Sequence, residues 1–90
     1  MAEKVRNIFD KRLTLLSFNY LAEKNRRVHL NTLHTYLNKF DDWLFSEVVD
    51  AVRGLESNCL AKIEQNETTK ITLSGLRVYE LLEKIRDELP

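Results

Sequence analysis

The sequence predicts a mainly α-helical domain with one small β-sheet, an α+β fold. The 90 residues include only two glycines and one proline, so residues that interrupt helices are scarce. Apolar residues recur at helical spacing along most of the chain. Between Leu60 and Leu73 the spacing changes to an alternation of period two, around the polar segment NETT. Two short β-prone runs around a turn predict a single hairpin in an otherwise helical chain.

The composition is that of one globular domain, and we expect residues 1–90 to form it. The chain is 43% hydrophobic and 31% charged, which is too apolar for a disordered protein. No apolar run reaches the roughly 20 residues of a membrane helix, and the segment MAEKVRNIFD does not have the pattern of a signal peptide. Cys59 has no second cysteine to pair with in the chain, so we expect a cytoplasmic protein. A Cys59–Cys59 bridge between two chains stays open.

The first helix is expected near residues 5–24. One stripe of apolar residues at helical spacing comprises Val5, Phe9, Leu13, Leu16 and Tyr20, and the other side of the helix holds Ile8, Leu15 and Phe18. A helix that is apolar on two sides is buried on both. This helix is therefore expected to lie at the centre of the fold or to be shared with another subunit.

A short extended segment and a second helix are expected to follow. The run from Lys24 to Arg27 predicts a polar turn, and Val28–Leu30 an extended segment. Asn31 is expected to cap a helix from Thr32 to about Asn38, because its side-chain oxygen can accept a bond from a backbone N–H of the first turn. This helix buries Leu33 and Leu37.

The third helix is expected from about Asp42 to Glu56. Asp41 or Asp42 is the expected N-cap, and the buried face comprises Leu44, Val48, Val52 and Leu55. Asn58 is expected to end the helix in the left-handed conformation. The hairpin follows, and then a last helix that Thr72 or Ser74 caps and that continues to about Glu88.

The expected order is therefore helix, strand, helix, helix, hairpin and helix, which is the plan of a winged helix-turn-helix domain. Two segments resemble the small bacterial and archaeal winged-helix regulators of the MarR, PadR and ArsR types and their viral and plasmid relatives. VVDAVRGLESNCLAKI resembles the end of a recognition helix and the start of the wing. ITLSGLRVYELL resembles the LTxxG start of the helix after the wing, with Thr72 and Gly75 in the matching positions. Glycine at this position lets the helix pack closely on the sheet.

The resemblance implies a transcription regulator that binds double-stranded DNA as a homodimer, with two third helices on two half-sites. Residues 1–40 hold 8 Lys/Arg against 3 Asp/Glu, although the net charge of the chain is zero. The candidate DNA-binding residues are Lys24, Arg26, Arg27, Trp43, Ser46, Arg53, Lys62 and Lys70. The candidate dimer interface comprises Phe9, Leu15, Phe18, Val78, Leu82, Ile85 and Leu89, on the helices near 5–24 and 74–88.

A different class of function is a winged-helix module that binds another protein through the acidic helix 42–56. Residues 41–58 hold five Asp/Glu and only Arg53 as a base, and carboxylates next to a duplex are repelled by its phosphates. Trp43 and Phe45 lie either in the core or on this contact surface. We expect no metal, cofactor or enzymatic activity, because His29 and His34 have no partner at ligand spacing and Cys59 has no activating base.

Overall fold

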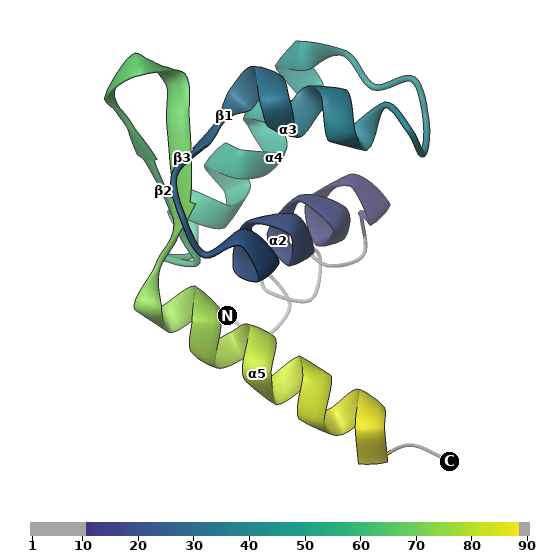
Figure 1. Ribbon diagram of the computed structural model, residues 1–90, viewed down its shortest axis with the longest axis vertical. Helices are drawn as coiled ribbons and strands as arrows, with labels where there is room; N and C mark the ends of the chain where they lie inside the picture. Colours follow the sequence, from purple (N-terminus) through teal and green to yellow (C-terminus); the bar gives the residue numbers. More distant parts are fainter. Residues whose placement is uncertain (1–10, 89–90) are drawn as a thin grey trace.

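The computed structural model describes residues 11–88, so Val5, Ile8, Phe9 and Leu89 of the predicted stripes lie outside the described residues. The chain is mainly helical with one small three-stranded antiparallel sheet, as predicted (Figure 1). In chain order the elements are α2 (Arg12–Lys24), β1 (Val28–His29), α3 (Leu30–Leu37), α4 (Phe45–Ser57), β2 (Ala61–Glu64), a 3-10 turn (Gln65–Glu67), β3 (Thr68–Ile71) and α5 (Leu73–Glu88).

The sheet has the strand order β1-β3-β2, so the second strand of the hairpin is central. Val28 pairs with Thr69 on one side of β3, and Ile63 pairs with Thr69 on the other. Thr69 is fully buried, and its hydroxyl donates to the carbonyl oxygen of Lys62 at 3.0 Å. Side chains alternate between the two faces of a strand, so the face that holds Val28, Ala61 and Ile71 is buried and the opposite face meets solvent.

The core lies between α2, α3, α4 and the buried face of the sheet. Its fully buried large side chains are Phe18, Leu21, Leu33, Leu37, Val48, Val52 and Leu55. Helix α2 touches α3, α4, α5 and β3, so the two apolar sides of this helix are explained by a central position. Phe18, one of the predicted interface residues, is 0% exposed in the single chain and packs in this core.

Helix α3 begins two residues before the predicted start. The predicted cap, Asn31, is wrong, because His29 occupies the N-cap position and its Nδ1 accepts from the backbone N–H of Asn31 at 3.1 Å. An imidazole nitrogen thus caps the helix, where the sequence predicted an amide oxygen as the cap. Leu33 and Leu37 are buried as predicted.

Helix α4 begins at Phe45, three residues later than predicted, and neither Asp41 nor Asp42 caps it. A tertiary contact holds the preceding residues out of the helix, since Nε2 of His34 lies 2.7 Å from the carbonyl oxygen of Trp43. Leu44 is the N-cap residue and is 67% exposed, so its predicted place in the core was wrong. The carboxylate of Glu47 reaches back to accept the backbone N–H of Leu44 at 2.9 Å.

The connections of the hairpin also differ from the sequence prediction. The left-handed residue after α4 is Cys59, with φ of 61°, whereas Asn58 has φ of −104°. At the tip, Asn66 and Glu67 adopt φ of 64° and 56°. The strand after the tip therefore starts at Thr68, earlier than the alternating run from Lys70 indicated.

The start of α5 is fastened to the turn between α4 and β2. The hydroxyl of Thr72 accepts the backbone N–H of Gly75 at 2.9 Å, which confirms Thr72 as the cap. The same hydroxyl donates to the carbonyl oxygen of Cys59 at 2.6 Å. Helix α5 contacts α2, and its last turns project away from the other elements (Figure 1).

Candidate nucleic-acid interface

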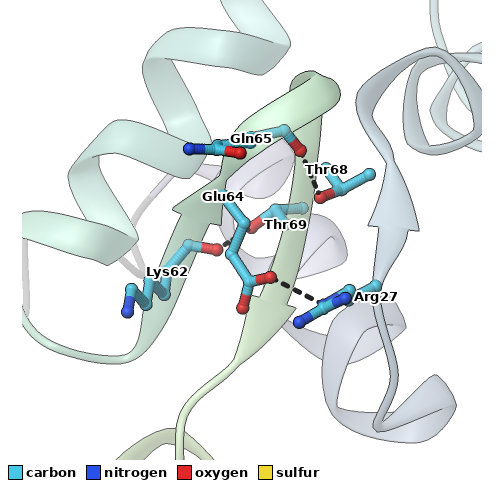
Figure 2. Close-up of polar contacts among 6 residues, drawn as sticks. All are labelled: Arg27, Lys62, Glu64, Gln65, Thr68 and Thr69. Carbon is cyan, nitrogen blue, oxygen red and sulfur yellow. Dashed lines mark hydrogen bonds and ion pairs between the residues drawn. The ribbon is translucent and has the colours of Figure 1, made fainter.

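The solvent-facing side of the sheet gathers three of the predicted DNA-binding residues. Lys62 on β2 and Lys70 on β3 are exposed on this face, because their neighbours Ala61 and Ile71 point into the core. Arg27 immediately precedes β1 and reaches over the same face (Figure 2). We call Arg27, Lys62 and Lys70 the basic sheet face.

Lys62 and Lys70 are directly paired across the hairpin. Side chains at paired positions of antiparallel strands lie about 4.5–5.5 Å apart at their β-carbons, and like charges there destabilise the sheet. Opposite charges at such pairs stabilise a sheet instead. An anion bound above the pair would remove the repulsion, so the arrangement suits phosphate binding.

Arg27 is held by an ion pair rather than free in solvent. Its Nε lies 2.6 Å from Oε2 of Glu64, and Figure 2 shows the arginine reaching across β3 toward that carboxylate. The Arg27 side chain is 71% exposed, whereas that of Glu64 is 25% exposed. The pair fixes the guanidinium group beside a shallow hollow of about 590 Å³ that Lys62 also lines, and the remaining guanidinium N–H groups stay accessible.

Two exposed carboxylates of α4 accept backbone N–H groups of this chain. Oε1 of Glu47 accepts the N–H of Leu44, and Oε2 of Glu56 accepts the N–H of Ile63 on β2 at 2.8 Å. Both carboxylates are thus engaged with backbone groups of this chain. The outer stripe at helical spacing comprises Ser46, Asp50, Arg53 and Ser57, all exposed, and it carries one acid and one base.

Trp43 and Phe45 pack against the core, which was one of the two alternatives that the sequence left open for them. Both side chains are partly buried against the core cluster. The ring of Phe45 meets His34 edge-on, with centroids 5.7 Å apart. Trp43 precedes α4 instead of lying in its first turn, so it is not part of the outer stripe on which Ser46 and Arg53 lie.

Within residues 11–88, no contact joins Lys24 or Arg26 to the basic sheet face. Arg26 is exposed in the turn between α2 and β1. Lys24 points back along α2, with Nζ 5.5 Å from the centroid of Tyr20. Lys24 belongs to a group of aromatic and basic residues on α2 and α3. The sequence did not predict this group, because its central contact joins Tyr20 and Tyr36 from two different helices.

The predicted interface residues on α5 are accessible. Leu82 and Ile85 are 38% and 53% exposed, and Val78 is partly buried against the core. Leu81, at 59% exposed, widens the apolar stripe beyond the predicted residues. On α2, Leu15 is half-buried. The accessible part of the predicted interface therefore lies mainly on the projecting part of α5.

Two further findings bear on the class of site. No helix within residues 11–88 combines the length and the apolarity needed to cross a lipid bilayer. In the same part of the chain, no three His, Cys, Asp or Glu side chains come together in a way that would hold a metal ion. Comparisons with protein-family models, with curated proteins and with solved structures found no match to this chain.

Proposed function

We propose that the chain is a winged helix-turn-helix protein that binds double-stranded DNA as a homodimer and regulates transcription. The observed order of elements supports the fold assignment, because β1 joins the β2–β3 hairpin in one sheet after the order helix, strand, helix, helix. In this assignment α4 is the recognition helix and the hairpin is the wing. The role in transcription rests on the resemblance of the segments around Leu60 and Gly75 to winged-helix regulators.

One observation carries the DNA-binding proposal: Lys62 faces Lys70 across the hairpin, with Arg27 on the same face. Lysine and arginine side chains that neutralise phosphates supply most of the sequence-independent affinity for DNA. Phosphate contacts position a protein on the duplex, whereas base contacts give specificity. Ser46 and Arg53 on the outer stripe of α4 are the candidates for base contacts.

The outer stripe of α4 supports DNA over the alternative of an acidic protein-binding helix, because it holds one acid and one base. Glu47 and Glu56 are exposed and keep their charge, and each carboxylate also accepts a backbone N–H of this chain. Asp50 remains exposed beside Arg53. The outer stripe of α4 is thus neutral in sum, with the exposed Glu47 and Glu56 on its two flanks.

The homodimer would form through the exposed apolar stripe of α5. Leu81, Leu82 and Ile85 are large apolar residues on the projecting turns, where no other element of the described chain covers them. A second copy of the same helix would bury this stripe and place two basic sheet faces in one assembly. The charged residues of α5 include both signs, which suits pairing with an identical helix.

The DNA proposal is tested by two substitutions at one position of the hairpin. Lys70→Gln should lower the slope of log K against log salt by about one unit for each bound chain, because each chain loses one phosphate contact. Lys70→Glu should weaken duplex binding further and yet stabilise the domain by about 0.2–1 kcal/mol, since it places an acid opposite Lys62. Fluorescence anisotropy with a labelled random duplex and thermal unfolding measure the two effects.

The matched control is Lys84→Gln, which removes the same charge from an exposed position on α5. It should leave the salt slope for duplex DNA unchanged. Equal slopes for unmodified protein, Lys70→Gln and Lys84→Gln would exclude the basic sheet face as the phosphate-binding surface. A gain in stability together with a loss of binding in Lys70→Glu would show that unfolding is not the cause of the loss.

A further inference from the structure

A cluster of three aromatic rings lies on α2, α3 and the turn after α3. Tyr20 and Tyr36 face each other with ring centroids 4.3 Å apart and planes inclined by 31°. The ring of Phe40 meets Tyr36 edge-on, at a centroid distance of 5.4 Å. Phe40 is 41% exposed, and the two tyrosines are half-buried. We call these three residues the ring cluster, and all of them reach the protein surface.

Each ring of the cluster has a cation over it. Nζ of Lys24 lies 5.5 Å from the centroid of Tyr20, and Nζ of Lys39 lies 5.9 Å from that of Tyr36. The guanidinium carbon of Arg12 lies 5.9 Å from the centroid of Phe40. These distances are within the range of cation–π attraction. Arg12, Lys24 and Lys39 are all exposed, so each cation is accessible to an anion.

A shallow groove of about 500 Å³ runs between α2 and α3 beside the ring cluster. Its lining includes both tyrosines, Lys24 and Lys39, together with the polar residues Thr32 and Thr35. Glu23 is the one acidic residue in this lining, so the groove carries an excess of positive charge among the described residues. A positively charged groove with aromatic side chains is the surface on which single-stranded nucleic acids bind.

We propose that the ring cluster and its three cations bind single-stranded nucleic acid. A base stacked on an aromatic ring is held more strongly than an exposed ammonium group over the same ring. A base therefore replaces the lysine over the tyrosine ring, and the displaced ammonium group binds the adjacent phosphate. The ligand that satisfies both groups supplies a flat ring and a negative charge together, as each nucleotide does.

Other ligands match only half of this surface. An acidic peptide offers carboxylates to Lys24 and Lys39. These carboxylates would pull the two ammonium groups away from the tyrosine rings, and the peptide would then leave the rings uncovered. Duplex DNA offers phosphates, but its bases are already stacked inside the helix. The site goes beyond the proposed duplex binding and is separate from it, because it uses residues of α2, α3 and the following turn, whereas the basic sheet face uses Arg27 and the hairpin lysines.

The test is fluorescence anisotropy of the full chain with a labelled oligothymidine of about ten nucleotides, within the usual site size of such proteins. A duplex of the same length, thymidine monophosphate and a polyglutamate peptide serve as unlabelled competitors. We expect the single strand to bind with a salt slope near −2, because three cations each contribute about −0.7. We expect thymidine monophosphate and polyglutamate to compete weakly, since each lacks the chain of rings and charges.

The variants separate ring contacts from charge contacts. Phe40→Leu and Tyr36→Leu keep apolar side chains but should weaken single-strand binding roughly tenfold each, since each removes one stacking platform. Lys24→Gln and Lys39→Gln, at exposed positions, should each reduce the salt slope by about 0.7. Lys70→Gln is the control, and it should leave single-strand affinity unchanged. Thermal unfolding of each variant checks the fold.

Two results would overturn the single-strand site. In the first, polyglutamate competes with the labelled oligothymidine as strongly as unlabelled oligothymidine does. This result would assign the surface to acidic proteins. Unchanged affinity in Phe40→Leu, with reduced affinity in Lys24→Gln and Lys39→Gln, would show that the rings make no contact with bases. Neither result affects the duplex proposal, which depends on Lys70 and not on Phe40.

Discussion

Gly75→Ala should destabilise the domain by about 3 kcal/mol or more, because overpacking that meets backbone cannot relax cheaply. A β-carbon at this position would overlap the carbonyl oxygen of Leu60 and lie 2.7 Å from Cγ1 of Ile71. Relief would require α5 to move off the sheet and would break the bond from the Gly75 N–H to Thr72. Urea denaturation measures the loss. Domains of this size have a free energy of unfolding of roughly 5–14 kcal/mol, so the change is a large fraction of the total.

Gly54→Ala is the matched control, because the same methyl group would meet nothing within 4 Å on α4. Alanine favours the helix over glycine by about 1 kcal/mol, so this variant should be more stable than the unmodified protein. Opposite signs for the two Gly→Ala changes would establish that the packing of α5 against the β2 end of the sheet requires a glycine. A Gly75→Ala protein as stable as the unmodified one would contradict this close contact.

Leu82→Glu combined with Ile85→Glu should convert the protein from dimer to monomer. Both residues are exposed on the projecting turns of α5, so charges there cost little in a single chain but are buried next to identical charges in a dimer. Light scattering at tens of micromolar, roughly the usual working range, should give about twice the 10.6 kDa chain mass for the unmodified protein and the chain mass for the variant.

Glu80→Gln, at an exposed position on the polar side of α5, is the control and should leave the dimer intact. Circular dichroism should show the same helix content in both variants, since neither removes a core side chain. A monomeric unmodified protein in this concentration range would contradict the dimer and leave the α5 stripe without an assigned partner.

The order of elements followed from the sequence because the signals for it are local. Helical spacing through α2, α4 and α5 and the change of period at the hairpin depend on residues close together in the chain. Thr72 and Gly75 were also predictable, because the cap and the close approach at the start of α5 belong to one short motif. These features place the sheet and therefore Lys62 and Lys70.

The features that the sequence did not predict depend on contacts between distant residues. The start of α4 is set by the bond between His34 and Trp43, which outweighs the capping preference of the two aspartates. The hydrogen bond from the N–H of Ile63 on β2 to the carboxylate of Glu56 joins residues seven apart and was not predicted. Tyr20 and Tyr36 stack across two helices, and no local spacing indicates such a pair.

Binding of duplex DNA by the basic sheet face is tested most directly by titration of the unmodified protein with a random-sequence duplex. Fluorescence anisotropy at about 50 mM and about 200 mM salt measures how affinity depends on ionic strength. If the hairpin lysines and Arg27 bind phosphates, the protein binds at the lower salt concentration and the affinity falls at the higher one by about 40-fold for each chain that contacts the duplex, as three phosphate contacts per chain require. A duplex that does not bind at the lower salt concentration, or that binds equally at both, would contradict the claim.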